Sequence, residues 1–206
     1  LYREWFVRLR FPGHEHTRIT DGVPEGWSNV SLAEITSKIG SGFTPRGGES
    51  AYLPEGTPLI RSMNVYDDLF QDEGLAFVGE AHAEALGGVV VESKDILLNI
   101  TGASVARCCM APERYLPARV NQHVMIIRVD PEKADPFFVH KAVNSDERKR
   151  QLLSYAQKGS TREALTKEMM ARFEMLLATV TLMRQFGEIA ATSFRQREIL
   201  ALQNQK

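Results

Sequence analysis

Cysteine is nearly absent from this 206-residue sequence, which contains only Cys108 and Cys109. Adjacent cysteines cannot link distant segments without strain, and no other cysteine is available to complete a tetrahedral metal site. No apolar run approaches the roughly 18–20 residues that a membrane-spanning helix needs, and no signal-peptide pattern is present. These absences predict a protein of the reducing cytoplasm. The first residue is Leu1 rather than methionine, so we also expect the chain to be part of a longer protein.

A charge excess of either sign is lacking as well. Lys and Arg number 25 against 26 Asp and Glu, which gives a formal net charge of −1. This balance does not exclude a nucleic-acid partner, because phosphate binding needs a local basic face rather than a basic protein. Hydrophobic residues make up 43% of the chain and charged residues 25%, a composition typical of a packed globular domain.

Motifs for catalysis are the third absence. Glu92-Ser-Lys94, with Asp72 upstream, has the residue types of a metal-dependent nuclease site, but its place before a new apolar run is typical of a solvated turn. His14 and His16 offer two metal ligands without a third. The glycines of 40–48 are not followed by Gly-Lys-Ser/Thr, so this segment is not a nucleotide-binding P-loop. Motifs for binding S-adenosylmethionine and for methylating adenine are missing too. We therefore expect no catalytic residue, no metal and no cofactor.

Short strands and helices share the middle of the chain, which predicts an α+β fold. Ser31-Leu-Ala-Glu34 is a capping-box pattern that predicts a short helix, ended by Gly40. The Gly-, Pro- and Ser-rich stretch 40–56 predicts a long loop. Apolar runs predict strands at 58–62, 95–100, 105–110 and 123–129, and helical patterns predict helices at 80–86, 137–144 and 146–157, followed by a break at Gly159-Ser160.

Both ends of the chain show helical periodicity. In residues 1–10, one predicted face carries Tyr2, Trp5, Phe6 and Leu9, and Pro12-Gly13 ends the pattern. Residues 173–177 fit either a buried strand or part of a continuous helix, because periodicity alone does not separate the two. From residue 182 onward, a helix of about 25 residues, or nearly 40 Å, is predicted. Such a helix is expected to pair with another helix through an apolar seam at roughly heptad spacing, formed by Leu182, Phe186, Ile189 and Leu200.

Polar segments next to the predicted strands are the candidates for binding. Loop 40–48 offers backbone N–H groups, hydroxyls and a guanidinium, which suit phosphate oxygens. Segment 61–66 contains Arg61 and Asn64, the residue types that make bidentate contacts with guanine and adenine edges. Segments 99–107 and 158–162 are further polar turns. The candidate contact residues are Ser41, Thr44, Arg46, Arg61, Ser62, Asn64, Tyr66, Thr101, Ser104, Arg107, Lys158 and Arg162. Taken alone, these residues indicate a binding module without naming its partner.

Six motifs occur in a defined order along the chain. They are Leu-Tyr-Arg-Glu-Trp-Phe-Val-Arg-Leu-Arg-Phe-Pro-Gly at 1–13, Gly-Ser-Gly-Phe-Thr-Pro-Arg-Gly-Gly at 40–48 with Tyr52, Gly-Thr-Pro-Leu-Ile-Arg-Ser-Met-Asn-Val-Tyr-Asp at 56–67, Asp-Ile-Leu-Leu-Asn-Ile-Thr-Gly at 95–102, Asn-Gln-His-Val-Met-Ile-Ile-Arg at 121–128, and Gly-Ser-Thr at 159–161. Each motif is weak alone. In this order they span nearly the whole chain, and together they resemble the specificity subunit of type I restriction–modification enzymes.

The resemblance implies a compact mixed α/β target-recognition domain followed by a long C-terminal helix for an antiparallel coiled coil. It divides the chain into the end of a preceding conserved helix (1–12), a linker (13–26), the recognition domain (27–178) and a spacer or dimerisation helix (179–206). It also favours a strand at 173–177. The family usually has a proline between this strand and the helix, whereas the present chain has Ala178-Thr179-Val180, so a continuous helix stays open.

The resemblance further implies sequence-specific recognition of double-stranded DNA, with this chain reading one half of a bipartite target. The chain is then expected to be non-catalytic and to direct the adenine-N6 methylation (modification) subunits and the restriction subunit of the complex. A homodimer through the C-terminal helix is a further expected arrangement. Three alternatives stay open: the recognition domain of another adenine-methyltransferase system, a half-length specificity protein that dimerises, and a helical scaffold whose globular domain binds protein.

Overall fold

A computed structural model of the chain describes residues 1–45, 47–158 and 164–203. Its central layer is an antiparallel four-stranded sheet in the order β11-β10-β13-β4. The strands are β4 (Thr36–Ser41), β10 (Ile96–Asn99), β11 (Cys108–Met110) and β13 (Val124–Val129). Successive side chains of a strand face opposite sides, so Ile96 and Leu98 enter one apolar cluster and Leu97 enters another. Because both faces are buried, the sequence shows continuous apolar runs here rather than alternation.

A second four-stranded sheet packs on one face of the first. Its order is β8-β5-β12-β9, and its strands are β5 (Thr57–Ile60), β8 (Ala76–Val78), β9 (Val90–Val91) and β12 (Ala118–Val120). β5 and β12 run parallel, whereas the other pairs are antiparallel. The smaller apolar cluster fills the space between the sheets, where Leu59 and Val120 meet Leu97 and Ile126. Helix α2 (Glu80–Ala85) contributes Ala83 to the same cluster.

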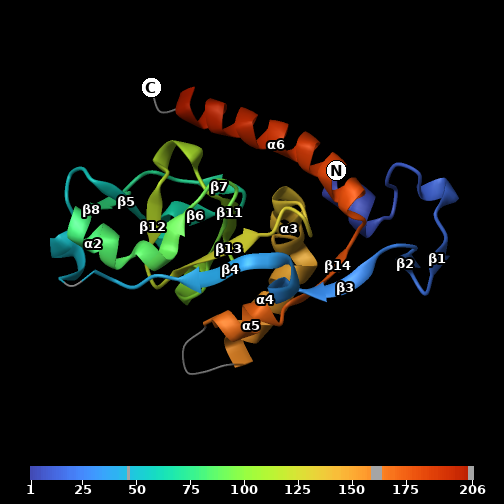
Figure 1. Cartoon of the computed structure of the whole chain (residues 1–206), viewed down its shortest axis with the longest axis horizontal. Helices are drawn as coiled ribbons and strands as arrows, with labels where there is room; N and C mark the ends of the chain where they lie inside the picture. The colour runs from blue at the N-terminus through green and yellow to red at the C-terminus, as the bar shows by residue number, and fades with distance from the viewer. Residues whose placement is uncertain (46, 159–163, 204–206) are drawn as a thin grey trace.

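Helices cover the other face of the central sheet. They are α1 (Leu32–Ile35), α3 (Pro136–Val143), α4 (Asp146–Lys158), α5 (Lys167–Ala171) and α6 (Val180–Gln203), and the larger apolar cluster lies beneath them. Figure 1 shows α3, α4 and α5 grouped beside the sheets, with the 24-residue α6 running across the top of the view. The N-terminus lies beside the start of α6. The far end of α6 lies away from the N-terminus. The predicted mixed α/β fold with a long C-terminal helix is thus confirmed.

Short elements complete the chain. Three strand pairs join β1 (Ile19–Thr20) to β2 (Val23–Pro24), β6 (Val65–Tyr66) to β7 (Leu69–Phe70), and β3 (Ser28–Ser31) to β14 (Glu174–Leu177). Single helical turns occur at η1 (Arg3–Val7), η2 (His14–His16), η3 (Gly48–Ala51), η4 (Ser62–Asn64), η5 (Gly87–Val89), η6 (Gly102–Ser104) and η7 (Glu113–Tyr115). The predicted helix at 1–10 is therefore limited to η1, although its aromatic face does pack into the core.

The ambiguity at 173–177 is resolved in favour of a strand. β14 pairs antiparallel with β3, with Glu174 opposite Ser31 and Leu177 opposite Ser28, and α6 begins at Val180. The prediction of one short helix from Ser31 to Gly40 was wrong in its second half. The Ser31–Glu34 capping box is present, but the helix ends at Ile35 because residues 36–41 pair with β13 as β4. The predicted loop 40–56 consequently begins only at Gly42.

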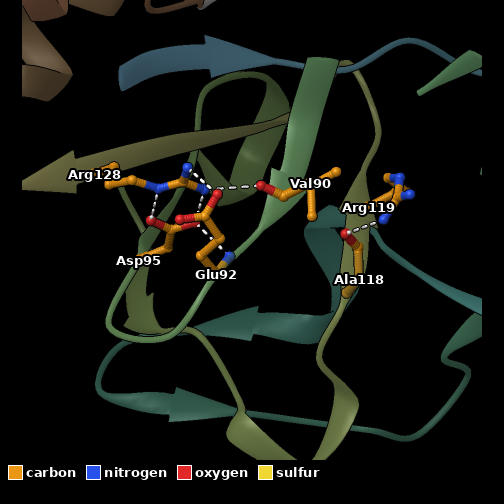
Figure 2. A network of polar contacts seen from close by, with 6 residues as sticks. All are labelled: Val90, Glu92, Asp95, Ala118, Arg119 and Arg128. Carbon is orange, nitrogen blue, oxygen red and sulfur yellow. Dashed lines mark hydrogen bonds and ion pairs between the residues drawn. The ribbon is translucent and has the colours of Figure 1, made fainter. Parts of the chain in front are cut away.

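The nuclease-like triplet lies in a turn, as predicted, and its glutamate belongs to an ion-pair network (Figure 2). Arg128 of β13 donates from Nε and Nη2 to the two carboxylate oxygens of Asp95, each at 2.8 Å, and it also pairs with Glu92. Arg128 Nη2 reaches Val90 O at 2.9 Å, so the network ties β13 to β9 of the other sheet. In the described ranges, no group of three or more His, Cys, Asp or Glu could hold a metal ion. Within the same ranges, no helix combines the length and apolarity needed to cross a membrane.

Candidate nucleic-acid interface

Four loops that are distant in sequence meet at one end of the two sheets. β4 ends at Ser41, which lies opposite Met125 at the start of β13, and β10 ends at Asn99, opposite Val124. The parallel strands β5 and β12 end side by side, with Ile60 opposite Val120. The segments 42–45, 61–66, 100–107 and 121–123 therefore lie together, and we call them the loop end. Most of the contact residues predicted from the sequence belong to it.

A chain of polar contacts joins these loops. Thr44 Oγ1 donates to Gln122 Oε1, and Gln122 Nε2 lies 3.0 Å from His123 Nε2. The other ring nitrogen of His123, Nδ1, lies 2.6 Å from Thr101 Oγ1. Hydroxyl, amide and imidazole groups from three loops thus form one connected, partly exposed surface. Such groups can donate to phosphate oxygens, and they can donate to or accept from base edges.

The turn at 61–64 is built by two buried asparagines. Asn64 Oδ1 accepts from Arg61 N at 3.0 Å, and Asn64 Nδ2 donates to Gln71 O at 3.0 Å. Asn99 Nδ2 donates to Ser62 O at 2.9 Å. Asn64 is fully buried, so its amide shapes the turn and does not reach a base edge in this conformation. The predicted base-reading role of Asn64 therefore gives way to a supporting one.

The two arginines of the loop end are stacked on tyrosines. Arg61 Cζ lies 5.0 Å from the Tyr52 ring centroid, and Arg61 Nη2 donates to Gly74 O at 2.6 Å. Arg107 Cζ lies 4.8 Å from the ring centroid of Tyr66, which is exposed. Stacking orients a guanidinium before it binds, which reduces the side-chain freedom lost on contact with phosphate or guanine.

An acidic turn beside Tyr66 is fastened to the helical layer. Asp68 accepts from Lys141 Nζ at 2.6 Å and from Asn144 Nδ2 at 3.0 Å, both on the α3 side. Burial alone would raise the pKa of Asp68, but hydrogen bonding to Lys141 and Asn144 and the nearby positive charge keep it below its usual value. The neighbouring Asp67 pairs with Lys149 of α4. These contacts neutralise two carboxylates that would otherwise oppose a polyanion next to Tyr66 and Arg107.

The remaining predicted residues fall into two groups. Ser41 ends β4, Ser62 begins η4 and Ser104 ends η6, all partly buried at or next to the loop end. Arg46 and Arg162 lie outside the described residues, as does the side chain of Lys158 at the end of α4. The chain returns to the loop end directly afterwards, because Ala164 forms a β-bridge with Thr101.

Sequence reasoning missed several residues of this surface. Gln122 and His123 lie in a polar turn between two apolar strands, a signal that was present in the sequence. Asn99 ends a buried strand, and only the fold shows which turn its amide holds. Phe43 and Met63 are exposed apolar side chains at the loop end, with 46% and 47% of their surface exposed, and no periodicity marks them.

Gly42 brings the 42–45 loop against β12. Gly42 N donates to Asn121 O at 3.1 Å, and a Cβ added at Gly42 would lie 1.8 Å from the backbone oxygen of Val120. We expect Gly42→Ala to displace this loop and to lower stability by about 1–3 kcal/mol, the usual range for overpacking. Thermal unfolding would measure the loss, and Gly40→Ala is the matched control because a Cβ there meets nothing within 4 Å. Equal melting temperatures for the two variants would contradict the close approach.

The fold is similar to that of several solved structures. The sequence matches no protein-family model, and a search of curated proteins gives no significant match. The structure is similar to the HsdS subunit from Thermoanaerobacter tengcongensis, with 16% identity and a TM-score of 0.58 over 93% of this chain. It is also similar to the S subunit of a type I restriction–modification system from M. genitalium, with 14% identity and a TM-score of 0.59 over 87% of this chain. This is the fold of type I specificity subunits.

A third match has the same character. It is a chain from a type I restriction–modification system whose structure concerns complex assembly and conformational transition, with 19% identity and a TM-score of 0.61 over 89% of this chain. The chain spans less than half the length of each of these three structures, with a coverage of 43–46%.

Proposed function

We propose that this chain is a non-catalytic specificity module that recognises one half of a bipartite sequence in double-stranded DNA. The observation that carries the proposal is the loop end, where hydroxyl, amide and imidazole groups from distant segments are joined by hydrogen bonds on a specificity-subunit fold, with the stacked guanidinium of Arg107 on one of the same segments. A small rigid surface with many donors suits a duplex, whose grooves and phosphates present acceptors.

Different residues of the loop end have different proposed roles. Thr44, Ser62, Thr101, Ser104 and Arg107 contact DNA, together with Ser41, Arg61 and Tyr66. Arg46, Lys158 and Arg162 stay in the proposed contact set, because Arg46 directly follows the 42–45 segment in the chain and the stretch with Lys158 and Arg162 precedes Ala164, which forms a β-bridge with Thr101. Asn64 supports the turn from which Arg61 and Ser62 project.

We further propose that residues 27–178 form the recognition domain and that 179–206 form a spacer helix, with 1–12 ending a preceding helix and 13–26 linking it to the domain. Through the spacer helix the chain would direct the modification subunits and the restriction subunit to DNA. Antiparallel helix pairing, with another segment or with a second copy, would use the part of α6 that the chain itself leaves uncovered. Ile189 and Leu200 are the exposed members of the predicted seam, at 49% and 57%.

The test is genetic and chemical. The reading frame is deleted from its source genome, and methylated adenines are mapped before and after. We expect one split motif to lose methylation in the deletion strain, and complementation to restore it. An unchanged methylation pattern in a strain with active modification subunits would contradict the proposal.

A salt titration separates DNA recognition from protein binding. We expect Arg107→Ala to weaken duplex binding and to reduce the slope of log affinity against log salt by about 0.9, the contribution of one phosphate contact. Arg18→Ala is the control, because Arg18 is an exposed arginine directly before β1, and Figure 1 shows β1 far from β5 and β12, the strands that end at the loop end. If both variants keep the wild-type slope, Arg107 does not contact a phosphate; a wild-type chain without salt dependence would instead favour a protein partner.

A further inference from the structure

An exposed methionine lies in a turn of the loop end that two asparagine side chains hold by hydrogen bonds. Met63 has 47% of its surface exposed, although its neighbours Arg61, Ser62 and Asn64 are polar. Asn64 and Asn99 are both fully buried, and the hydrogen bonds of their amides go to backbone groups of this turn and of the segment that follows it. Burying two asparagine amides to hold one short turn fixes where its apex residue points.

The backbone beneath Met63 fixes the side chain as well. A Cβ added at Gly74, whose φ is +68°, would lie 2.7 Å from Met63 Cε and 3.6 Å from Met63 Sδ. The methionine therefore rests on a position that has no side chain. The carbonyl oxygen of Gly74 also accepts a hydrogen bond from Arg61, so the Met63 thioether and the Arg61 guanidinium both contact this glycine.

A half-exposed apolar side chain among hydrogen-bond donors suits a ligand whose surface is polar but includes a small apolar group. Double-stranded DNA has such a group in the major groove, where each thymine presents its 5-methyl group beside acceptors and donors of the neighbouring bases. We propose that Met63 packs against the 5-methyl group of a thymine in the bound half-site and makes the chain prefer thymine at that position. The proposal rests on the DNA-reading function of the loop end and adds a specificity-determining residue to it.

The experiment uses the chain assembled with its modification subunits and the duplex whose sequence is taken from the mapped methylation motif. Each thymine of the half-site, on either strand, is replaced in turn by deoxyuridine, which lacks only the 5-methyl group. For the wild-type complex we expect one position at which this replacement weakens binding about fourfold, the value of one methyl-sized apolar group. For Met63→Ala we expect the thymine and deoxyuridine duplexes to bind equally at that position, with unchanged responses elsewhere.

Ile19→Ala is the matched control. Ile19 is an apolar residue of nearly the same exposure, 46%, but it lies in β1, which pairs with β2 and stands far from β5 and β12 in Figure 1. Its variant should keep the wild-type response to deoxyuridine, and all three proteins should show the same melting temperature. The proposal is overturned if the wild-type complex prefers thymine nowhere, or if Met63→Ala keeps the full preference. Failure of the DNA-reading function itself is a different result, in which the wild-type complex fails to distinguish its motif from a scrambled duplex.

Discussion

Replacing Phe186 by alanine is expected to lower the free energy of unfolding by about 3–5 kcal/mol, the range for truncating a buried phenylalanine. Phe186 lies on α6 and is only 2% exposed. Its ring centroid is 5.2 Å from that of Phe6, 6.0 Å from that of Tyr2 and 6.2 Å from that of Trp5. Alanine would leave a cavity where the N-terminal segment meets α6. Urea unfolding followed by circular dichroism measures the change.

The control for Phe186 is its neighbour on the same helix. Ile189 is 49% exposed, so Ile189→Ala is expected to change stability by no more than about 0.5 kcal/mol. Ile189→Glu with Leu200→Glu is likewise expected to leave the fold intact, and it would test helix pairing without damage to the core. If Phe186→Ala proved as mild as Ile189→Ala, the packing of α6 against the larger apolar cluster would be contradicted.

The contrast between these residues changes the interpretation of the predicted seam. The heptad pattern placed Leu182, Phe186, Ile189 and Leu200 together as helix-pairing residues, because periodicity records which residues share a face. It does not record what covers that face. In the structure Leu182 and Phe186 are covered by the chain itself, whereas Ile189 and Leu200 are exposed. A glutamate at Phe186 would therefore disrupt the core before it could report on association.

The fold was largely predictable where local pattern and burial agree. Residues 96–98 and 124–127 are apolar throughout because both faces of the central sheet are covered, and they lie within the strands predicted at 95–100 and 123–129. β4 was missed because a capping box and a following glycine fit a short helix, and only pairing with β13 makes residues 36–41 extended. At 173–177 the sequence allowed a strand or a helix, and pairing with β3, more than a hundred residues earlier in the chain, makes this segment a strand.

The candidate site was predictable as a set of loops but not as a surface. Polar residue types marked the segments around Thr44, Arg61 and Thr101, yet no local signal shows that Gln122 and His123 connect them. Residue type also misled for Asn64. An asparagine after a strand fits a base-reading residue, but equally a residue that satisfies the backbone of a tight turn. Burial, which is a property of the fold, decides between the two.

Arg128→Met is expected to destabilise the protein by about 3–5 kcal/mol, because removing one member of a buried ion pair leaves the other charge unpaired. Asp95 has no exposed surface, and both of its carboxylate oxygens accept from Arg128. Hydrogen bonding to Asp95 raises the pKa of Arg128 above its usual value, so the guanidinium is charged at neutral pH. The loss would appear as a lower urea midpoint with an unchanged slope.

A second substitution shows whether the unpaired charge is the cause. In Arg128→Met with Asp95→Asn, the buried charge is gone, while the amide oxygen can still accept from Glu92 N, as Asp95 Oδ2 does at 2.7 Å. The double variant should therefore be more stable than Arg128→Met alone, even though it carries one more change. Glu92→Gln serves as the comparison at the exposed side of the network, where the Glu92 side chain is 57% exposed and an ion pair contributes at most about 1 kcal/mol. A double variant less stable than the single one would contradict this cause, because removal of the buried Asp95 charge would then bring no gain in stability.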